Sequence, residues 1–213
     1  MIITVFGATG KVGKRIIQMA LASGNKVRAF GRNMEGLIDE DLRNENFTAI
    51  KGYVFSNGDV FDAVNGCDAV LSTLGGAFDG ADKTRSLGMK NIIAQMQKTG
   101  VKRIIAIGSS GVLKDDDYGY ILNNPKYPDL YKPVGMEHLK AYEYLNESNL
   151  DWTYVCCPDI KDKDATGKYV TNIDYSTIPN LFTITAGNVA SFMLNELTGN
   201  RYVKKRVAIS DVN

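Results

Sequence analysis

The feature that most constrains this chain is a glycine-rich turn close to its beginning. An apolar run over residues 2–6 leads directly into Gly7-Ala8-Thr9-Gly10-Lys11-Val12-Gly13, and apolar residues at helical spacing follow. Glycines at this spacing between a strand and a helix let the backbone turn tightly and approach a phosphate. The helix that begins there offers free N–H groups and the positive end of its dipole. The pattern predicts a site for the pyrophosphate of a dinucleotide; a tight turn without a ligand is the alternative interpretation.

Strand and helix patterns alternate along the rest of the chain. We expect strands over residues 2–6, 26–30, 47–51, 68–74, 102–108, 151–156 and 205–210. We expect helices over residues 11–23, 57–64, 82–99, 134–148 and 187–197. Strands separated by helices imply a parallel sheet with right-handed crossovers, and several of these strands are apolar throughout, as in a sheet covered on both faces. The predicted fold class is α/β, a doubly wound parallel sheet of the Rossmann type, in one domain spanning residues 1–213.

Two irregular stretches interrupt the alternation, at about 111–133 and 158–186. Both follow late strands, at the carboxyl edge where open α/β sheets bind their ligands, and long loops in compact domains are usually functional. We interpret them as substrate-side loops. The first contains four tyrosines, Tyr118, Tyr120, Tyr127 and Tyr131. One of these could supply a proton or stack on a flat substrate, or they could simply close a local core.

The residue after the second strand indicates which dinucleotide is bound. In NAD-binding versions an acidic residue stands about 20 residues past the glycines and takes the ribose hydroxyls. Arg32, flanked by Gly31 and Asn33, holds that place here, 19 residues beyond Gly13. A guanidinium pairs with a 2′-phosphate in bidentate fashion, so the residue type favours NADP(H). An exposed turn arginine is the alternative; for Arg15, which could assist, a surface role is the preferred interpretation.

Composition excludes several classes of function. A net charge of +1 gives no electrostatic case for nucleic acid or an anionic membrane, and no apolar run approaches the ~20 residues of a membrane span. The beginning of the chain lacks a signal-peptide pattern, so we expect the cytoplasm. The three cysteines, Cys67, Cys156 and Cys157, form neither a disulfide framework nor a zinc site, and we expect no metal. A small molecule is the expected partner; the oligomeric state is left open.

Taken together, these residues resemble the atypical short-chain dehydrogenase/reductases, and in particular the NAD(P)-binding, NmrA-like group that includes the biliverdin/flavin reductases. The resemblance covers nearly the whole chain. Its motifs are the glycine turn at 7–13, the second strand and basic turn at 27–33, Lys51-Gly52-Tyr53-Val54, the 66–75 segment, Ile107-Gly108-Ser109-Ser110-Gly111, and the 148–155 segment. These motifs are specific for the family and unspecific for the substrate.

The resemblance implies a set of cofactor-binding residues. On the pyrophosphate side it implies Gly7, Thr9, Gly10, Lys11, Val12 and Gly13. It implies Arg32 and Asn33 at the 2′-phosphate, Tyr53 and Val54 beside the adenine, Leu74 and Gly75 against the nicotinamide ribose, and Ser109 near the nicotinamide.

Departures from the family pattern concern the chemistry. The Tyr-x-x-x-Lys pair of catalytic short-chain dehydrogenases is missing, because Val134 and His138 hold those positions. An imidazole has an unperturbed pKa of about 6.5, but at the lysine position it suits ribose or phosphate binding better than substrate protonation. An ordinary helix-surface histidine is the alternative. Our candidate catalytic residues are Ser109, His138 and Tyr131. For Cys156 and Cys157 a redox role is open, but burial as small hydrophobes is the preferred interpretation.

The sequence therefore favours an NADPH-dependent reductase that delivers hydride to a planar conjugated acceptor of the flavin or quinone type. Such an acceptor can take its proton from solvent, so the missing tyrosine–lysine pair is tolerable. A non-catalytic NADP(H)-sensing regulatory protein is one alternative, because fold alone does not imply catalysis. A sugar-nucleotide epimerase-like enzyme is another, although little sequence remains after residue 159 to build a nucleotide-sugar domain.

Overall fold

The computed structural model describes residues 1–34 and 45–212. Its main sheet has eight strands: β1 (Ile2–Phe6), β2 (Lys26–Gly31), β3 (Phe47–Lys51), β4 (Ala69–Ser72), β5 (Arg103–Ser109), β8 (Asp151–Cys157), β10 (Tyr169–Ile173) and β12 (Lys205–Asp211). The helices of the described ranges are α1 (Lys11–Ala22), α2 (Asn57–Val64), α3 (Ser86–Thr99), α4 (Lys132–Asn146) and α5 (Ala186–Gly199). Each predicted strand and helix is present, with ends that differ by a few residues.

The strands lie in the order β10-β12-β8-β5-β4-β1-β2-β3. All neighbouring pairs are parallel except β10 with β12, which are antiparallel. The chain winds outward from β1 through β2 and β3, then crosses back to β4 and continues the other way. The prediction of a doubly wound Rossmann fold is confirmed, and its switch point lies between β1 and β4, where such folds bind ligands.

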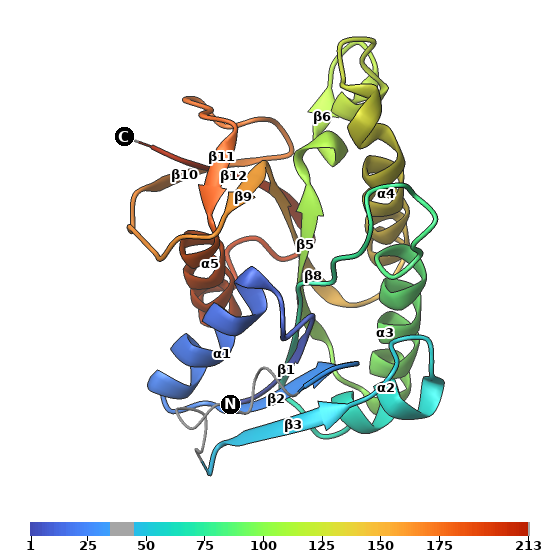
Figure 1. The fold of residues 1–213 in the computed structure, drawn as a ribbon, viewed down its shortest axis with the longest axis vertical. Helices are drawn as coiled ribbons and strands as arrows, with labels where there is room; N and C mark the ends of the chain where they lie inside the picture. Colours follow the sequence, from blue (N-terminus) through green and yellow to red (C-terminus); the bar gives the residue numbers. More distant parts are fainter. Residues whose placement is uncertain (35–44, 213) are drawn as a thin grey trace.

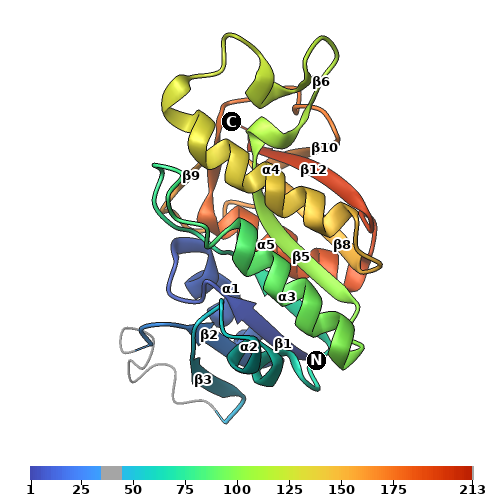
Figure 2. The same ribbon diagram turned by 90° about the vertical axis from the view of Figure 1, so that its right-hand side faces the viewer.

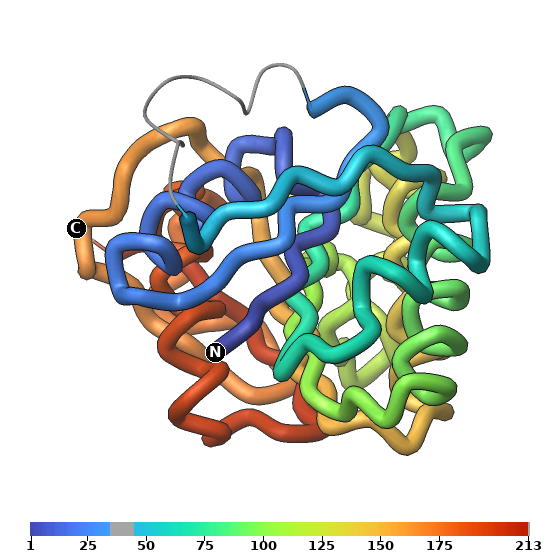
Figure 3. The backbone as a smooth tube through the Cα atoms, turned by 90° about the horizontal axis from the view of Figure 1, so that it is seen from below, coloured from blue at the N-terminus to red at the C-terminus, as the bar shows by residue number. Residues whose placement is uncertain are grey.

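Helices cover the sheet on both sides, as the tube view from below makes clear (Figures 1 and 3). α1 and α5 pack on one face, where Ile16, Ile17 and Val189 are fully buried. α2, α3 and α4 pack on the other, where Ile92, Met96 and Leu145 are fully buried. Trp152 and Phe192 belong to these two cores.

The stretch at 158–186 is more regular than predicted. It contains β9 (Asp159–Lys161) and β11 (Thr183–Thr185), which pair in parallel, as well as the edge strand β10. β10 is partly exposed along its whole length and is held by its register with β12, Tyr169 opposite Asp211. Because an exposed edge strand needs no apolar run, the hydrophobic pattern gave no sign of it.

The stretch at 111–133 consists mainly of short turns. A hairpin whose loop is residues 116–118 joins β6 (Lys114–Asp115) to β7 (Gly119–Tyr120), and 3₁₀ turns occupy Ser110–Val112, Ile121–Asn123 and Asp129–Tyr131. α4 then begins at Lys132, slightly before the predicted start. The stretch lies at the same end of the molecule as β10, beyond the carboxyl end of β5 (Figures 1 and 2).

Ion pairs join the two stretches to each other. The Asp174 carboxylate lies 2.8 Å from Lys114 Nζ and 3.0 Å from Arg206 Nε, and Arg206 also donates a 2.7 Å hydrogen bond to the Val112 carbonyl. The Arg206 guanidinium is buried, with its Cζ 5.4 Å from the Tyr120 ring centroid. We call Lys114, Asp174 and Arg206 the loop brace. It connects segments that are far apart in the chain, so both substrate-side stretches have a fixed geometry.

Within the described ranges, none of the helices has both the length and the apolar character needed to cross a bilayer.

Candidate functional site

The turn between β1 and α1 admits only glycine at two of its positions. Gly7 has φ +76°, and a Cβ there would lie 2.4 Å from the Thr73 carbonyl oxygen at the end of β4. A Cβ on Gly13 would lie 2.3 Å from the Gly7 carbonyl oxygen. The Gly10 N–H closes the turn on the same Gly7 oxygen at 3.0 Å. The backbone is therefore folded tightly onto itself at the switch point of the sheet.

The first turn of α1 is left uncapped by side chains. Gly10 stands at the N-cap, no side chain accepts a hydrogen bond there, and the turn contains no acidic residue. The first intrahelical bond is Lys14 N–H to Gly10 at 3.0 Å, so the N–H groups of Lys11, Val12 and Gly13 have no helical partner. Because the Val12 side chain is only 5% exposed, Val12 can offer a ligand only its backbone N–H group. These groups fit the pyrophosphate of a dinucleotide, with Thr9, Gly10 and Lys11 exposed around it.

The segments predicted to flank the adenine and ribose come together. A Cβ on Gly88 of α3 would lie 3.0–3.1 Å from the side chains of both Leu74 and Val54, so these two residues pack over the same glycine. Tyr53 has 62% of its surface exposed, and its N–H donates to Asp59 Oδ2 at 2.8 Å, which contributes to the lowered pKa of that carboxyl. Gly75 is also exposed, at the end of β4. These segments thus bring the buried Val54 and the partly buried Leu74 together, with an exposed aromatic ring beside them.

Arg32 and Asn33 follow β2 directly and are exposed. Arg15 is engaged elsewhere: it lies 2.7 Å from Asp162 Oδ1 and 3.0 Å from Asp164 Oδ1. These contacts tie the segment after β9 to the first turns of α1. Arg15 is therefore held by carboxylates, whereas Arg32 is an exposed cation at the end of β2 without a carboxylate partner in the part of the chain that the structure describes.

The loop after β4 is clamped by a buried arginine that the sequence reading missed. Arg85 is 6% exposed and donates 2.9 Å hydrogen bonds to the Gly76 and Ala77 carbonyls. Asp82 accepts the Ala77 and Thr84 N–H groups at 3.1 and 2.8 Å, which delays the start of α3 to Ser86. No local pattern identifies Arg85, because its partners are backbone carbonyls of the loop. Its role is to hold the backbone that follows Leu74 and Gly75.

Ser109 lies at the carboxyl end of β5, where the strand turns into a 3₁₀ segment. Its hydroxyl accepts the Gly111 N–H at 3.2 Å. Of the four tyrosines in the adjacent loop, Tyr127 is partly buried, with its Oη 2.8 Å from where a Cβ on Gly111 would lie, whereas Tyr118 and Tyr131 are 44% and 47% exposed. Tyr131, our candidate from sequence, stays a prediction, and Tyr127 is the more buried of the two side chains.

His138 faces the interior of the molecule from α4. Its Nδ1 lies 3.5 Å from the Tyr154 hydroxyl, which donates a 2.8 Å hydrogen bond to the His138 carbonyl oxygen. Burial, together with the positive charge of Arg85, lowers the pKa of His138 to about 3. The imidazole is therefore uncharged near neutral pH, which disfavours both imidazolium acid catalysis and charge pairing with a phosphate.

Cys156 and Cys157 are buried near the end of β8. Burial raises the pKa of Cys156 to about 12 and raises that of Cys157 as well. Reactive cysteines are partly exposed thiolates, so burial as small hydrophobic residues is the interpretation that the structure supports.

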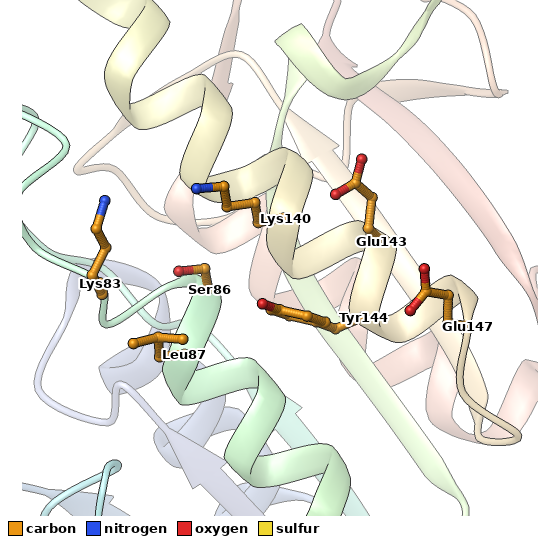
Figure 4. Close-up of a pocket in the computed structure, with 7 residues that line it drawn as sticks. All are labelled: Lys83, Ser86, Leu87, Lys140, Glu143, Tyr144 and Glu147. Atoms are coloured by element: carbon orange, nitrogen blue, oxygen red, sulfur yellow. The ribbon is translucent and has the colours of Figure 1, made fainter.

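A hollow between α3 and α4 lies apart from these residues (Figure 4). It is lined by Lys83, Ser86, Leu87, Lys140, Glu143, Tyr144 and Glu147. Beneath it the buried Glu137 accepts a hydrogen bond from Ser86 and lies 2.9 Å from Lys83 Nζ, which joins the two helices. None of the predicted site residues lines this hollow, so we assign it no part in cofactor binding.

The fold and the glycine turn define a dinucleotide-binding protein of the Rossmann class. A family model described as NAD(P)H-binding matches residues 7–200, and the chain belongs to that family. The match agrees with the resemblance to the atypical short-chain dehydrogenase/reductases. It supports a nicotinamide cofactor and an oxidoreductase-like fold, without distinguishing NADP from NAD.

Individual relatives are distant. An uncharacterized chloroplast protein of Arabidopsis thaliana is 28% identical over 174 residues, which cover 78% of this chain and 61% of that protein. A crystal structure from Streptococcus pneumoniae, provisionally named an NADH-flavin reductase, has a TM-score of 0.83 at 23% identity over the full length of both chains. A Bacteroides thetaiotaomicron structure, provisionally named an epimerase, has a TM-score of 0.86 at 24% identity, covering 100% of this chain and 97% of the other. These structures share the fold; the cellular compartment of this chain remains a prediction.

Proposed function

We propose that this chain is an NADPH-dependent reductase whose acceptor is a planar, conjugated molecule of the flavin or quinone type. The observation that carries the proposal is that Val134 holds the position of the family's catalytic tyrosine, and that His138, at the lysine position, packs against Tyr154 with its Nδ1 3.5 Å from that hydroxyl. Burial lowers the pKa of His138 to about 3 and raises the pKa of Tyr127. Near neutral pH both side chains can donate a hydrogen bond, but neither is a base strong enough to take a proton from a hydroxyl group. Such a site suits reduction of a delocalised acceptor and does not suit alcohol oxidation.

A bound reduced nicotinamide supplies the hydride, and the residues of this chain supply binding and orientation. The N–H groups of Lys11, Val12 and Gly13 receive the pyrophosphate. Leu74 and Gly75 line the nicotinamide ribose, and Arg85 keeps the following backbone in place. The substrate-side stretches close the opposite side, where the loop brace fixes their geometry.

The preference for NADP(H) rests on Arg32, an exposed cation at the end of β2 where an acid would repel a 2′-phosphate. The pneumococcal neighbour is named for NADH, so this part of the proposal needs its own test. NADPH and NADH are titrated against wild type and Arg32→Ala. Loss of the charged pair should weaken NADPH binding by roughly 1.5–3 kcal/mol and leave NADH binding unchanged. Equal affinities for the two cofactors in the wild type would contradict the preference, and Arg15→Ala serves as the matched control.

The reductase itself is tested by following NADPH oxidation with menadione and FMN as acceptors, and NADP⁺ reduction with a simple secondary alcohol. We expect turnover of at least one conjugated acceptor and none of the alcohol. Tight NADPH binding without turnover of either acceptor would favour the alternative, a regulatory protein that senses NADP(H).

A further inference from the structure

The chain that leaves β3 runs beside the chain that leaves β2. The Gly52 N–H donates a 3.0 Å hydrogen bond to the Gly31 carbonyl, so Tyr53 follows β3 alongside the place where Arg32 follows β2. A dinucleotide with its pyrophosphate on the first turn of α1 and its 2′-phosphate at Arg32 extends its base across β2 toward β3, because the strands lie in the order β1-β2-β3. The first exposed aromatic side chain after β3 is that of Tyr53, with 62% of its surface exposed.

The backbone of the turn at residues 53–56 is fixed on three sides. The Ser56 N–H donates to the Tyr53 carbonyl at 2.9 Å, and the Tyr53 N–H donates to Asp59 Oδ2 at 2.8 Å. The next carbonyl, that of Val54, accepts a 2.8 Å hydrogen bond from Asn91 Nδ2 on α3. The Tyr53 ring is therefore carried by a backbone that is already ordered, so binding a ligand against it costs little conformational entropy.

The side-chain oxygens of this turn and of the start of α2 already accept hydrogen bonds. Asp59 Oδ2 accepts the Tyr53 N–H, and Asp59 Oδ1 accepts the Ser56 hydroxyl at 2.8 Å. Ser56 Oγ in turn accepts the Asp59 N–H at 3.3 Å, and Asn57 Oδ1 accepts from Gln95 Nε2 at 3.4 Å. The exocyclic amino group of adenine is a donor and is recognised by an acceptor. These oxygens hold the turn together, whereas the Tyr53 ring offers a base its aromatic face.

We propose that Tyr53 holds the base of the dinucleotide by stacking, and that the site therefore accepts another purine in place of adenine. This inference rests on the proposed function, from which it takes the position of the 2′-phosphate at Arg32. Stacking on an aromatic side chain is tolerant of base identity, because every base has a π face, whereas a hydrogen-bonded site rejects a base that lacks the matching group. Selectivity for the cofactor then lies in Arg32 and the 2′-phosphate, and the base contributes affinity without being read.

A matched pair of dinucleotides tests the inference by binding alone. In nicotinamide hypoxanthine dinucleotide phosphate, a carbonyl oxygen replaces the amino group of adenine. The dissociation constants of NADPH and of this analogue in its reduced form are measured by titration, without an acceptor. We expect the two constants of the wild type to agree within about 3-fold, because stacking depends little on the identity of the base. A wild type that favours NADPH by more than this would overturn the inference.

Variants of Tyr53 test whether the ring is the group that holds the base. Tyr53→Ala should weaken binding of both dinucleotides by about 5-fold or more, the lower end of what stacking of one base contributes. Tyr53→Phe, which keeps the ring, should bind both as the wild type does. Tyr118→Ala, which removes an exposed tyrosine from the 111–133 stretch, is the control and should leave both affinities unchanged. Unchanged affinities in Tyr53→Ala, or a loss in Tyr53→Phe as large as in Tyr53→Ala, would overturn the inference.

A gained preference and a turnover assay complete the test. Tyr53→Asp places an acceptor where the ring stands, and it should favour NADPH over the hypoxanthine analogue by about 10-fold, the worth of one hydrogen bond to a charged group. No gain of preference in Tyr53→Asp would show that the base lies elsewhere and would overturn the inference.

The inference and the proposed function fail in different ways. A wild type that binds both dinucleotides alike, and through Tyr53, but reduces neither menadione nor FMN would overturn the reductase while leaving the stacking site standing. A wild type that reduces an acceptor with NADPH but binds the hypoxanthine analogue more than about 3-fold more weakly would overturn the stacking site while leaving the reductase standing.

Discussion

The glycine turn at residues 7–13 and the proposed acceptor-side stretches are each held in place by a different kind of contact. On the pyrophosphate side, Gly7, Gly10 and Gly13 contact one another's backbone within seven residues of sequence. On the acceptor side, the loop brace joins Lys114 and Asp174 to Arg206 across long stretches of chain. The first arrangement is local and allows almost no substitution. The second depends on charges that meet only in the folded protein. The comparison teaches that the cofactor side can be recognised from sequence, whereas the acceptor side is defined by tertiary contacts.

The largest effect is expected on the pyrophosphate side, for Gly13→Ala. The new Cβ would lie 2.3 Å from the Gly7 oxygen and 2.9 Å from Ala8 Cα, and both are backbone atoms that cannot move aside cheaply. We expect NADPH binding to become undetectable and the free energy of unfolding to fall by about 1–3 kcal/mol. Gly58→Ala in α2, where a Cβ meets nothing within 4 Å, is the matched control. Undiminished NADPH binding by folded Gly13→Ala would make the turn purely structural.

The next effect is expected on the acceptor side, for Arg206→Met. The change removes a buried cation from Asp174 and a donor from the Val112 carbonyl. We expect the free energy of unfolding in urea to fall by about 1–3 kcal/mol, because the Val112 carbonyl loses this donor and the partly exposed Asp174 keeps only Lys114. Lys114→Met, which removes the more exposed partner of the same carboxylate, should cost no more than about 1 kcal/mol. NADPH affinity should stay unchanged in both variants; a loss of affinity in Arg206→Met would show that the two sides are coupled.

Particular residues show which parts of the structure could be predicted from the sequence and which could not. Gly7-x-x-Gly10-x-x-Gly13 and the alternating apolar segments predict the doubly wound sheet, because they act through neighbouring backbone and through periodicity. Arg85 binds backbone carbonyls and has no motif. β10 is an exposed edge strand without an apolar pattern. The residues missed are those whose partners lie far away in the chain or on the backbone.

The pH dependence of the free energy of unfolding tests whether His138 is buried in the folded protein. Its pKa is about 3 in the folded protein and about 6.5 when unfolded, so the unfolded state binds more protons between these values. Stability should therefore fall as pH falls below 6.5, with His138 contributing up to about 1.4 kcal/mol per pH unit until pH approaches 3. His138→Gln should lose this contribution, so the difference between variant and wild type measures it. As the chain has one histidine, NMR titration reads its pKa directly. An imidazole that titrates near pH 6.5 in the folded protein would contradict the buried site.

The smallest effect is expected for Arg15→Ala, which removes the ion pairs between α1 and the segment after β9. Arg15 on α1 reaches Asp162 and Asp164 in the acceptor-side stretch, and the two carboxylates are 58% and 95% exposed. Because water and salt screen such pairs, Arg15→Ala should lower the free energy of unfolding by only about 0.2–1 kcal/mol, and less at high ionic strength. The ratio of NADPH to NADH affinity should not change, since Arg15 is held by carboxylates, whereas Arg32 is paired with none of the carboxylates in residues 1–34 and 45–212. If Arg15→Ala instead reduced NADPH affinity as strongly as Arg32→Ala does, the ion pair would have to open on binding. The segment after β9 would then respond to the cofactor, and the proposed acceptor side would be coupled to the pyrophosphate turn.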